Sequence, residues 1–148
     1  IAVADSFNIG NIIPRIVNIS APDTIVRPSD ETVALQLVSA EVFDADGLET
    51  IKWVGFTSYY VEGDSMMNKG NYIYLYDDGS DDILYPPNFT SGDDVSGDGI
   101  YSFRIPIYGT GFTDPDFQTK AGSFTWRFST QDASNEYSKT IEYDIIIQ

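Results

Sequence analysis

The chain has 148 residues, of which 42% are hydrophobic and 14% aromatic, so it is long enough and apolar enough to fold around a core. Its formal net charge is −15, and its eight basic residues are scattered, which argues against a nucleic-acid partner and against an anionic membrane surface. Because Cys and His are absent, disulfides, Ser-His-Asp catalysis and the usual zinc or copper sites are not expected, and any metal should be a hard cation held by oxygen.

The first part of the chain predicts a linker followed by two strands. Residues 1–11 have weak patterning and are predicted to be a lead-in segment or linker. Residues 12–20 predict a strand at a sheet edge, because Pro14 cannot donate a ladder hydrogen bond. Residues 32–44 form the longest predicted strand. Their apolar alternation slips by one residue after Leu37, which predicts a β-bulge or burial on both faces.

The rest of the chain reads as strands separated by turns and loops. A strand at 48–61 surrounds Trp53, residues 72–77 alternate strictly, and a polar loop of about twenty residues follows. Further strands are predicted at 100–108, 123–132 and 137–148. No window has helical periodicity, so the sequence predicts an all-β fold: one immunoglobulin-like antiparallel β-sandwich of seven to eight strands at residues 12–148.

Two stretches resemble parts of known bacterial proteins. GSFTWRFSTQDASNEYS (122–138) resembles the last two strands, with their connecting turn, of bacterial immunoglobulin-like and fibronectin-III-like modules. LYDDGS (75–80) and SGDDVSGDGIYS (91–102) resemble an acidic DDG, GD and GDGxY loop in secreted bacterial surface modules. The matching acids in that pattern are Asp78, Asp93 and Asp98. The insert at 81–90 departs from the pattern and makes the loop longer.

The resemblance also implies a role and a location. Such modules usually serve as spacers, adhesion units or accessory domains of secreted and cell-surface proteins. We therefore expect a non-catalytic extracellular module that is secreted, or anchored to lipid through a segment ahead of Ile1. Its expected partners are neighbouring domains of a larger surface protein and a protein or glycan ligand, with no direct membrane insertion. An accessory domain of a secreted hydrolase is an alternative.

The acidic loop is a candidate calcium site. Asp94, Ser96 and Asp98, followed by Gly99, match the first half of an EF-hand loop, in which alternate oxygen ligands converge on one ion. The Ile100 carbonyl would take the seventh position. The twelfth position is not Glu and no helix flanks the loop, so this is not an EF-hand. The missing ligands would come from Asp77 and Asp78 at the end of the preceding strand, with Asp93, and a bound calcium ion would have a structural role.

A simpler interpretation of the acidic loop remains open. Asp and Gly are ordinary turn formers, because Asp accepts hydrogen bonds from nearby backbone N–H groups and Gly adopts positive φ. An acidic soluble domain contains such turns without any metal.

The strand at 72–77 presents a second candidate site. Tyr72, Tyr74 and Tyr76 lie on one face of this strand and would form a flat platform for sugar rings, as in a carbohydrate-binding module. The alternative is that the long loop covers this face and that each hydroxyl reaches solvent. No carboxylate pair is evidently placed in an apolar pocket and no phosphate-binding loop is present, so we do not expect an enzyme.

Overall fold

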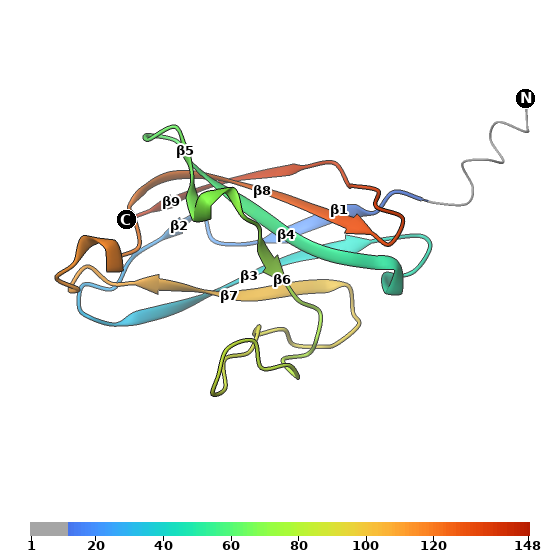
Figure 1. Ribbon diagram of the computed structural model, residues 1–148, viewed down its shortest axis with the longest axis horizontal. Coiled ribbons are helices and arrows are strands. Elements are labelled where there is room, and N and C mark those ends of the chain that lie inside the picture. Colours follow the sequence, from blue (N-terminus) through green and yellow to red (C-terminus); the bar gives the residue numbers. More distant parts are fainter. Residues whose placement is uncertain (1–11) are drawn as a thin grey trace, which may run out of the picture.

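The computed structural model describes residues 12–148 (Figure 1), so the predicted linker at 1–11 lies outside the described residues. The strands are β1 (Arg15–Ser20), β2 (Thr24–Ile25), β3 (Val33–Phe43), β4 (Ile51–Tyr60), β5 (Ser65–Met66), β6 (Ile73–Leu75), β7 (Ile100–Tyr108), β8 (Gly122–Asp132) and β9 (Ile141–Ile147). Three short 3-10 helices lie between them: η1 (Leu48–Thr50), η2 (Met67–Gly70) and η3 (Pro115–Phe117). Apart from the two-residue strands β2 and β5, this is the predicted set of strands.

The strands form two sheets packed face to face (Figure 1). One sheet has the order β1-β3-β7, and the other has the order β2-β9-β8-β4-β5, with β6 also paired to β4. Apart from the parallel pair of β2 and β9, neighbouring strands are antiparallel. The sheet of β1, β3 and β7 thus faces a sheet built on β4, β8 and β9. This is the immunoglobulin arrangement, so the predicted fold class is confirmed.

The core lies between the sheets and is dominated by aromatic side chains from β4 and β8. Phe56 packs against Trp126 and Phe128, with ring centroids 4.7 and 4.8 Å apart. These rings fill the space between the two sheets, in a chain that has no Cys to form an inter-sheet disulfide. The opposite sheet contributes the small buried side chains of β3, namely Val38, Ala40 and Val42.

The one-residue shift in the apolar pattern of β3 is not caused by a β-bulge or by burial on both faces, as was predicted. The register between β3 and β7 runs without interruption, and the bulge in this sheet lies in β1, between Ile16 and Asn18. Leu35 and Leu37 point to solvent and are 47% and 46% exposed. The prediction of a bulge in β3, or of burial on both of its faces, is therefore wrong. The apolar residues before the slip lie on the outer face, and those after it lie on the inner face.

The segment after β6 crosses from one sheet to the other. β6 pairs with β4, and the next residue, Tyr76, forms an isolated antiparallel bridge with Ser102 of β7. The predicted strand at 72–77 is therefore shorter than expected. Residues 76–99, which we call the acidic loop, then run beside β7 and return to its start (Figure 1). This crossing brings the end of the tyrosine strand to the Asp-rich segment.

Candidate metal site

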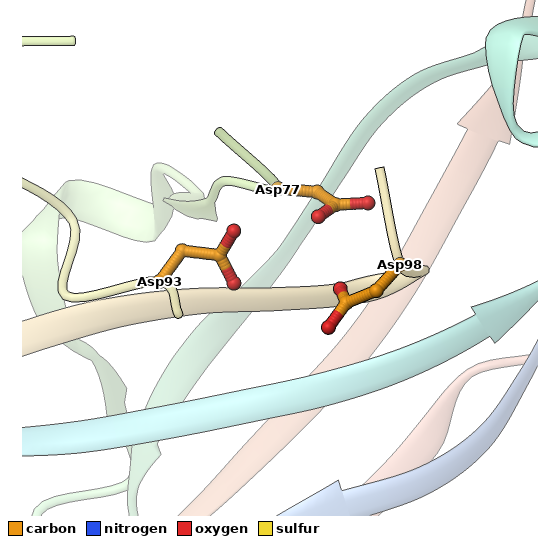
Figure 2. Close-up of side chains that lie close together, drawn as sticks. All are labelled: Asp77, Asp93 and Asp98. Atoms are coloured by element: carbon orange, nitrogen blue, oxygen red, sulfur yellow. The ribbon is translucent and has the colours of Figure 1, made fainter. Parts of the chain in front are cut away.

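Three carboxylates meet inside the acidic loop (Figure 2). Asp77 follows the β6 crossing, while Asp93 and Asp98 lie in the segment that leads into β7. One carboxylate oxygen of each residue lies within 4.8 Å of the others. The strand end therefore reaches the Asp-rich segment, and side chains separated by as many as 21 positions converge on one point.

Backbone N–H groups position the Asp77 carboxylate. Its Oδ1 accepts a hydrogen bond from the Gly97 N–H and its Oδ2 accepts one from the Gly99 N–H, both at 2.9 Å. The two glycines have φ values of 79° and 84°, a conformation that residues with a Cβ rarely adopt. The Gly-Asp-Gly segment therefore wraps around Asp77, and Asp98, the residue between the glycines, is held beside it.

Asp93 is the buried member of the group, at 4% exposure. Its Oδ2 accepts a hydrogen bond from the Gly79 N–H at 2.8 Å. Its Oδ1 accepts a longer one from the Ser102 hydroxyl on β7, at 3.4 Å. These contacts fasten both ends of the acidic loop to each other and to the sheet.

The electrostatics of the group are unfavourable for three free carboxylates. Burial raises the pKa of Asp77, and the neighbouring Asp98 carboxyl adds to this, against the lowering effect of the Gly99 and Gly97 N–H groups. Burial also raises the pKa of Asp93, with contributions from the charges of Asp77 and Asp98. The nearby Tyr101 hydroxyl has its pKa raised to about 12, first by burial and then by the charges of Asp77 and Asp93.

Among the described residues, no basic side chain forms an ion pair with any of the three carboxylates. Across residues 12–148 the one ion pair within 4.0 Å joins Arg127 to Glu142, both far from the acidic loop in the sheet. The group is thus a cluster of oxygen ligands without a protein cation. Oxygen clusters of this kind are what Ca²⁺ binds.

The other predicted ligands do not belong to the three-carboxylate group. Asp78 Oδ1 accepts hydrogen bonds from Ser80 N–H and from the Ser91 hydroxyl, and its Oδ2 is buried without a partner. Asp94 is exposed and stands outside the three-carboxylate group. Ile100 begins β7, and its N–H donates to Asp98 Oδ1 at 2.9 Å, which fixes the orientation of that carboxylate.

The predicted tyrosine stripe is divided between two environments. The rings of Tyr72 and Tyr74 pack on Trp53 of β4, with centroids 4.7 and 5.8 Å away. Tyr76 instead packs on Phe103 of β7, at 6.3 Å. Tyr74 is 43% exposed, whereas the other two tyrosines are half-buried.

Sequence reasoning missed Trp53 as part of this surface. A signal was present, because Trp53 is out of phase with Val54 and Phe56, which point into the core. The alternation of β4 therefore places the indole on the outer face of the sheet, beside the tyrosines of β6.

Comparison with known proteins yields structural neighbours but no family. No protein family matches the sequence, and no curated protein is similar enough in sequence to count as a relative. Fibronectin(III)-like modules of CbhA from Clostridium thermocellum align at 12% identity and a TM-score of 0.47, over 93% of this chain and 47% of that one.

Two further neighbours align over nearly the whole of both chains. The PKD domain of a peptidase from a Thermoplasmatales archaeon aligns at 13% identity and a TM-score of 0.44, over 93% of this chain and 97% of that one. A Niemann-Pick type C2 protein from the Japanese carpenter ant aligns at 15% identity and a TM-score of 0.44, over 94% of this chain and 96% of that one. In the part of the chain that is described, no helix is long and apolar enough to cross a membrane. By its own sheet topology, the chain is an immunoglobulin-like β-sandwich.

Proposed function

We propose that this chain is a non-catalytic, extracellular immunoglobulin-like module of a bacterial surface or secreted protein, and that one calcium ion stiffens its acidic loop. Asp77, Asp93 and Asp98 are the proposed ligands. The observation that carries the proposal is the convergence of their oxygens within 4.8 Å, with no ion pair to any of the three among residues 12–148.

The cost of leaving this site without a cation supports the proposal. At an effective dielectric constant of about 20, two unit charges about 5 Å apart repel by roughly 3 kcal/mol, and three carboxylates make three such pairs. Protonation relieves the repulsion at low pH, and a divalent cation relieves it at neutral pH. The raised pKa values of Asp77 and Asp93 are the same repulsion and burial expressed as proton affinity.

The chemistry of the ligands favours calcium over other metals. Carboxylate, backbone carbonyl and water oxygens in an irregular loop suit the flexible six- to eight-fold coordination of Ca²⁺ better than the strict octahedron of Mg²⁺. Calcium sites in extracellular modules work with dissociation constants of about 10⁻⁴ to 10⁻³ M, so a site of this class is about half to nine-tenths occupied at about 1 mM calcium. This agrees with the proposed location outside the cell.

The shape of the sandwich suits a spacer or adhesion unit. Figure 1 shows β1 beginning at one end of the long axis and β9 ending at the other. A module whose chain enters and leaves at opposite ends adds its full length to a string of neighbouring domains, which are its proposed partners. A bound calcium ion would hold the acidic loop against β7, so that a chain of such domains would contain fewer flexible segments.

Calcium added to chelator-treated protein is expected to raise the melting temperature. At a calcium concentration about 100 times Kd, linkage adds about 2.7 kcal/mol, which in a domain of this size corresponds to a shift of about 5 to 10 °C. Asp93→Asn keeps the size of the side chain and an acceptor for the Gly79 N–H, but it should lose most of the shift. The matched control is Asp94→Asn, next along the chain and outside the group, which should keep it.

Two results would contradict the proposal. One is an unchanged melting temperature together with no heat of binding in calorimetry. The other is an equal calcium response in the Asp93→Asn and Asp94→Asn variants, because that would place the ion elsewhere in this acidic chain.

A further inference from the structure

A hollow of about 710 Å³ lies on the outer side of β4, next to the acidic loop. Its lining combines aromatic rings with charged groups: Trp53, Tyr74, Tyr76, Glu49, Lys52 and Asp77. We propose that this hollow binds a hexopyranose unit of a neutral glycan, with the sugar ring stacked on Tyr74 and in contact with Trp53. The site differs from the platform predicted from the sequence, because it includes Trp53 and excludes Tyr72.

The aromatic walls are held in place before any ligand arrives. The indole N–H of Trp53 donates to the Gln131 side-chain oxygen at 2.8 Å, which fixes the plane of the ring. Tyr74 meets Trp53 edge-on, at an interplanar angle of 75°, so the two rings form a corner rather than a flat row. The C–H groups of a pyranose carry partial positive charge and are attracted to the negative face of an aromatic ring.

Gly55 makes this corner possible. It lies directly opposite Tyr74 in the β4–β6 pairing. A Cβ at this position would lie 2.8 Å from the Ile73 carbonyl oxygen and 3.3 Å from the Tyr74 ring. The absence of a side chain therefore lets Tyr74 lie close to the strand and beside Trp53.

The charged groups of the hollow provide both halves of a hydroxyl hydrogen bond. Lys52 donates, and its ammonium group already reaches Asn135 Oδ1 at 3.1 Å, while Glu49 and Asp77 accept. A sugar hydroxyl both donates and accepts, so it can use either kind of group. The volume falls within the range of about 300 to 1,000 Å³ that is usual for small-molecule sites, which leaves room for one or two sugar rings.

Charge favours a neutral glycan over the alternatives. A net charge of −15, with carboxylates in the hollow itself, opposes phosphates and acidic polysaccharides. A cationic peptide would meet the ammonium group of Lys52 in the same small space. A neutral ring with several hydroxyls conflicts with neither group.

Tryptophan fluorescence gives a direct measurement of binding. The chain has two tryptophans, and Trp126 is 4% exposed in the core, so a ligand in the hollow changes the emission of Trp53. The titration uses neutral oligosaccharides of glucose, galactose, mannose, xylose and N-acetylglucosamine, in calcium-containing buffer, with tetralysine as the cationic probe. At least one sugar should give a saturable change with a submillimolar to millimolar Kd.

A matched pair of variants then locates the site. Tyr74→Ala should weaken binding about tenfold, which corresponds to about 1.4 kcal/mol of lost stacking. Tyr137→Ala removes another exposed ring that also contacts Trp53, with centroids 6.1 Å apart, but that does not line the hollow, and it should leave Kd unchanged. Each variant is included only if its calcium-dependent melting matches the unmodified protein, which also separates failure here from failure of the calcium proposal.

Three results would overturn the proposal. They are no saturable change with any sugar, a response to tetralysine alone, and equal weakening by Tyr74→Ala and Tyr137→Ala.

Discussion

At the scale of single residues, the Asp side chains of this protein accept backbone hydrogen bonds of two kinds, from nearby and from distant N–H groups. Several of them cap their own turn: Asp44, for example, accepts from the Asp46 N–H, and Asp132 accepts from the Ser134 and Glu136 N–H groups. Asp77 and Asp93 accept instead from N–H groups 14 to 22 residues away. Asp residues that accept from N–H groups of their own turn stay scattered along the chain. Those that accept from distant N–H groups bring their carboxylates close together, and a bound cation would relieve the resulting repulsion.

The raised pKa values of Asp77 and Asp93 predict a pH dependence with a definite sign. A carboxyl whose pKa is higher in the folded state binds protons more tightly there, so the free energy of unfolding falls as the pH rises through that pKa. Calcium-free protein should therefore become more stable as the pH falls from neutral through these raised pKa values, which lie above the ordinary Asp value. The calcium-induced shift in melting temperature should shrink over the same range, because protons compete for the ligands.

Thermal unfolding measured at several pH values, with calcium and with chelator, checks this prediction. The double variant Asp77→Asn, Asp93→Asn is the control and should show a flatter pH profile without calcium. A calcium-free protein that loses stability steadily from pH 7 downward, with the same slope in the double variant, would argue against strained carboxylates in the loop.

The residues of the cluster could be predicted from the sequence only in part. The Asp-Gly spacing identified the loop, and Asp77, Asp93 and Asp98 were among the predicted ligands. The choice between Asp93 and Asp94 depends on backbone direction, because Gly92 turns the chain at a φ of 83° and places the first of the two against the sheet. Periodicity cannot supply that information in a loop.

At the scale of elements, the acidic loop is attached to β7 along much of its length. The Phe89 ring packs on Phe103, with centroids 5.9 Å apart, and the Arg104 guanidinium donates to the Thr90 carbonyl at 3.0 and 3.2 Å. The loop thereby covers the free edge of β7, which would otherwise offer unpaired backbone groups to other chains. A connection of this length without regular structure is uncommon and is usually functional.

Limited proteolysis tests whether calcium holds this loop. Chymotrypsin cleaves after exposed aromatic residues, and Phe89 is half-buried against β7. Removal of calcium should increase cleavage after Phe89 several-fold, because the loop then opens locally. Phe117, in the connection between β7 and β8 and 65% exposed, is the internal control and should be cut at an unchanged rate. If the cleavage rate after Phe89 is the same with and without calcium, as at Phe117, then calcium does not order the loop.

The elements also show which patterns sequence reasoning can interpret. Strand positions followed from alternation, and β3, β7, β8 and β9 lie close to the predicted ranges. The slip in the apolar pattern of β3 was wrongly predicted to be a bulge or burial on both faces. Alternation shows that the two faces of a strand differ, but it does not show which face is exposed to solvent. The shortening of β6 could not be predicted, since Tyr76 leaves its sheet to pair with Ser102, a contact distant in sequence.

At the scale of the whole molecule, the sandwich follows from strand count and composition, and its details follow from tertiary contacts. An all-β chain without disulfides needs a large apolar core, and the packed aromatic rings of β4 and β8 contribute much of it. The parallel pairing of β2 with β9 and the crossing of β6 toward β7 have no local signal in the sequence. That crossing places the aromatic hollow and the acidic cluster side by side, with Asp77 common to both.

A crystal structure of the protein grown in calcium tests the central claim most directly. The expected result is one ion, identified by its anomalous signal, with oxygens of Asp77, Asp93 and Asp98 about 2.3 to 2.6 Å away. Carboxylates that hold no ion at saturating calcium, or an ion bound at Asp94 instead, would contradict it.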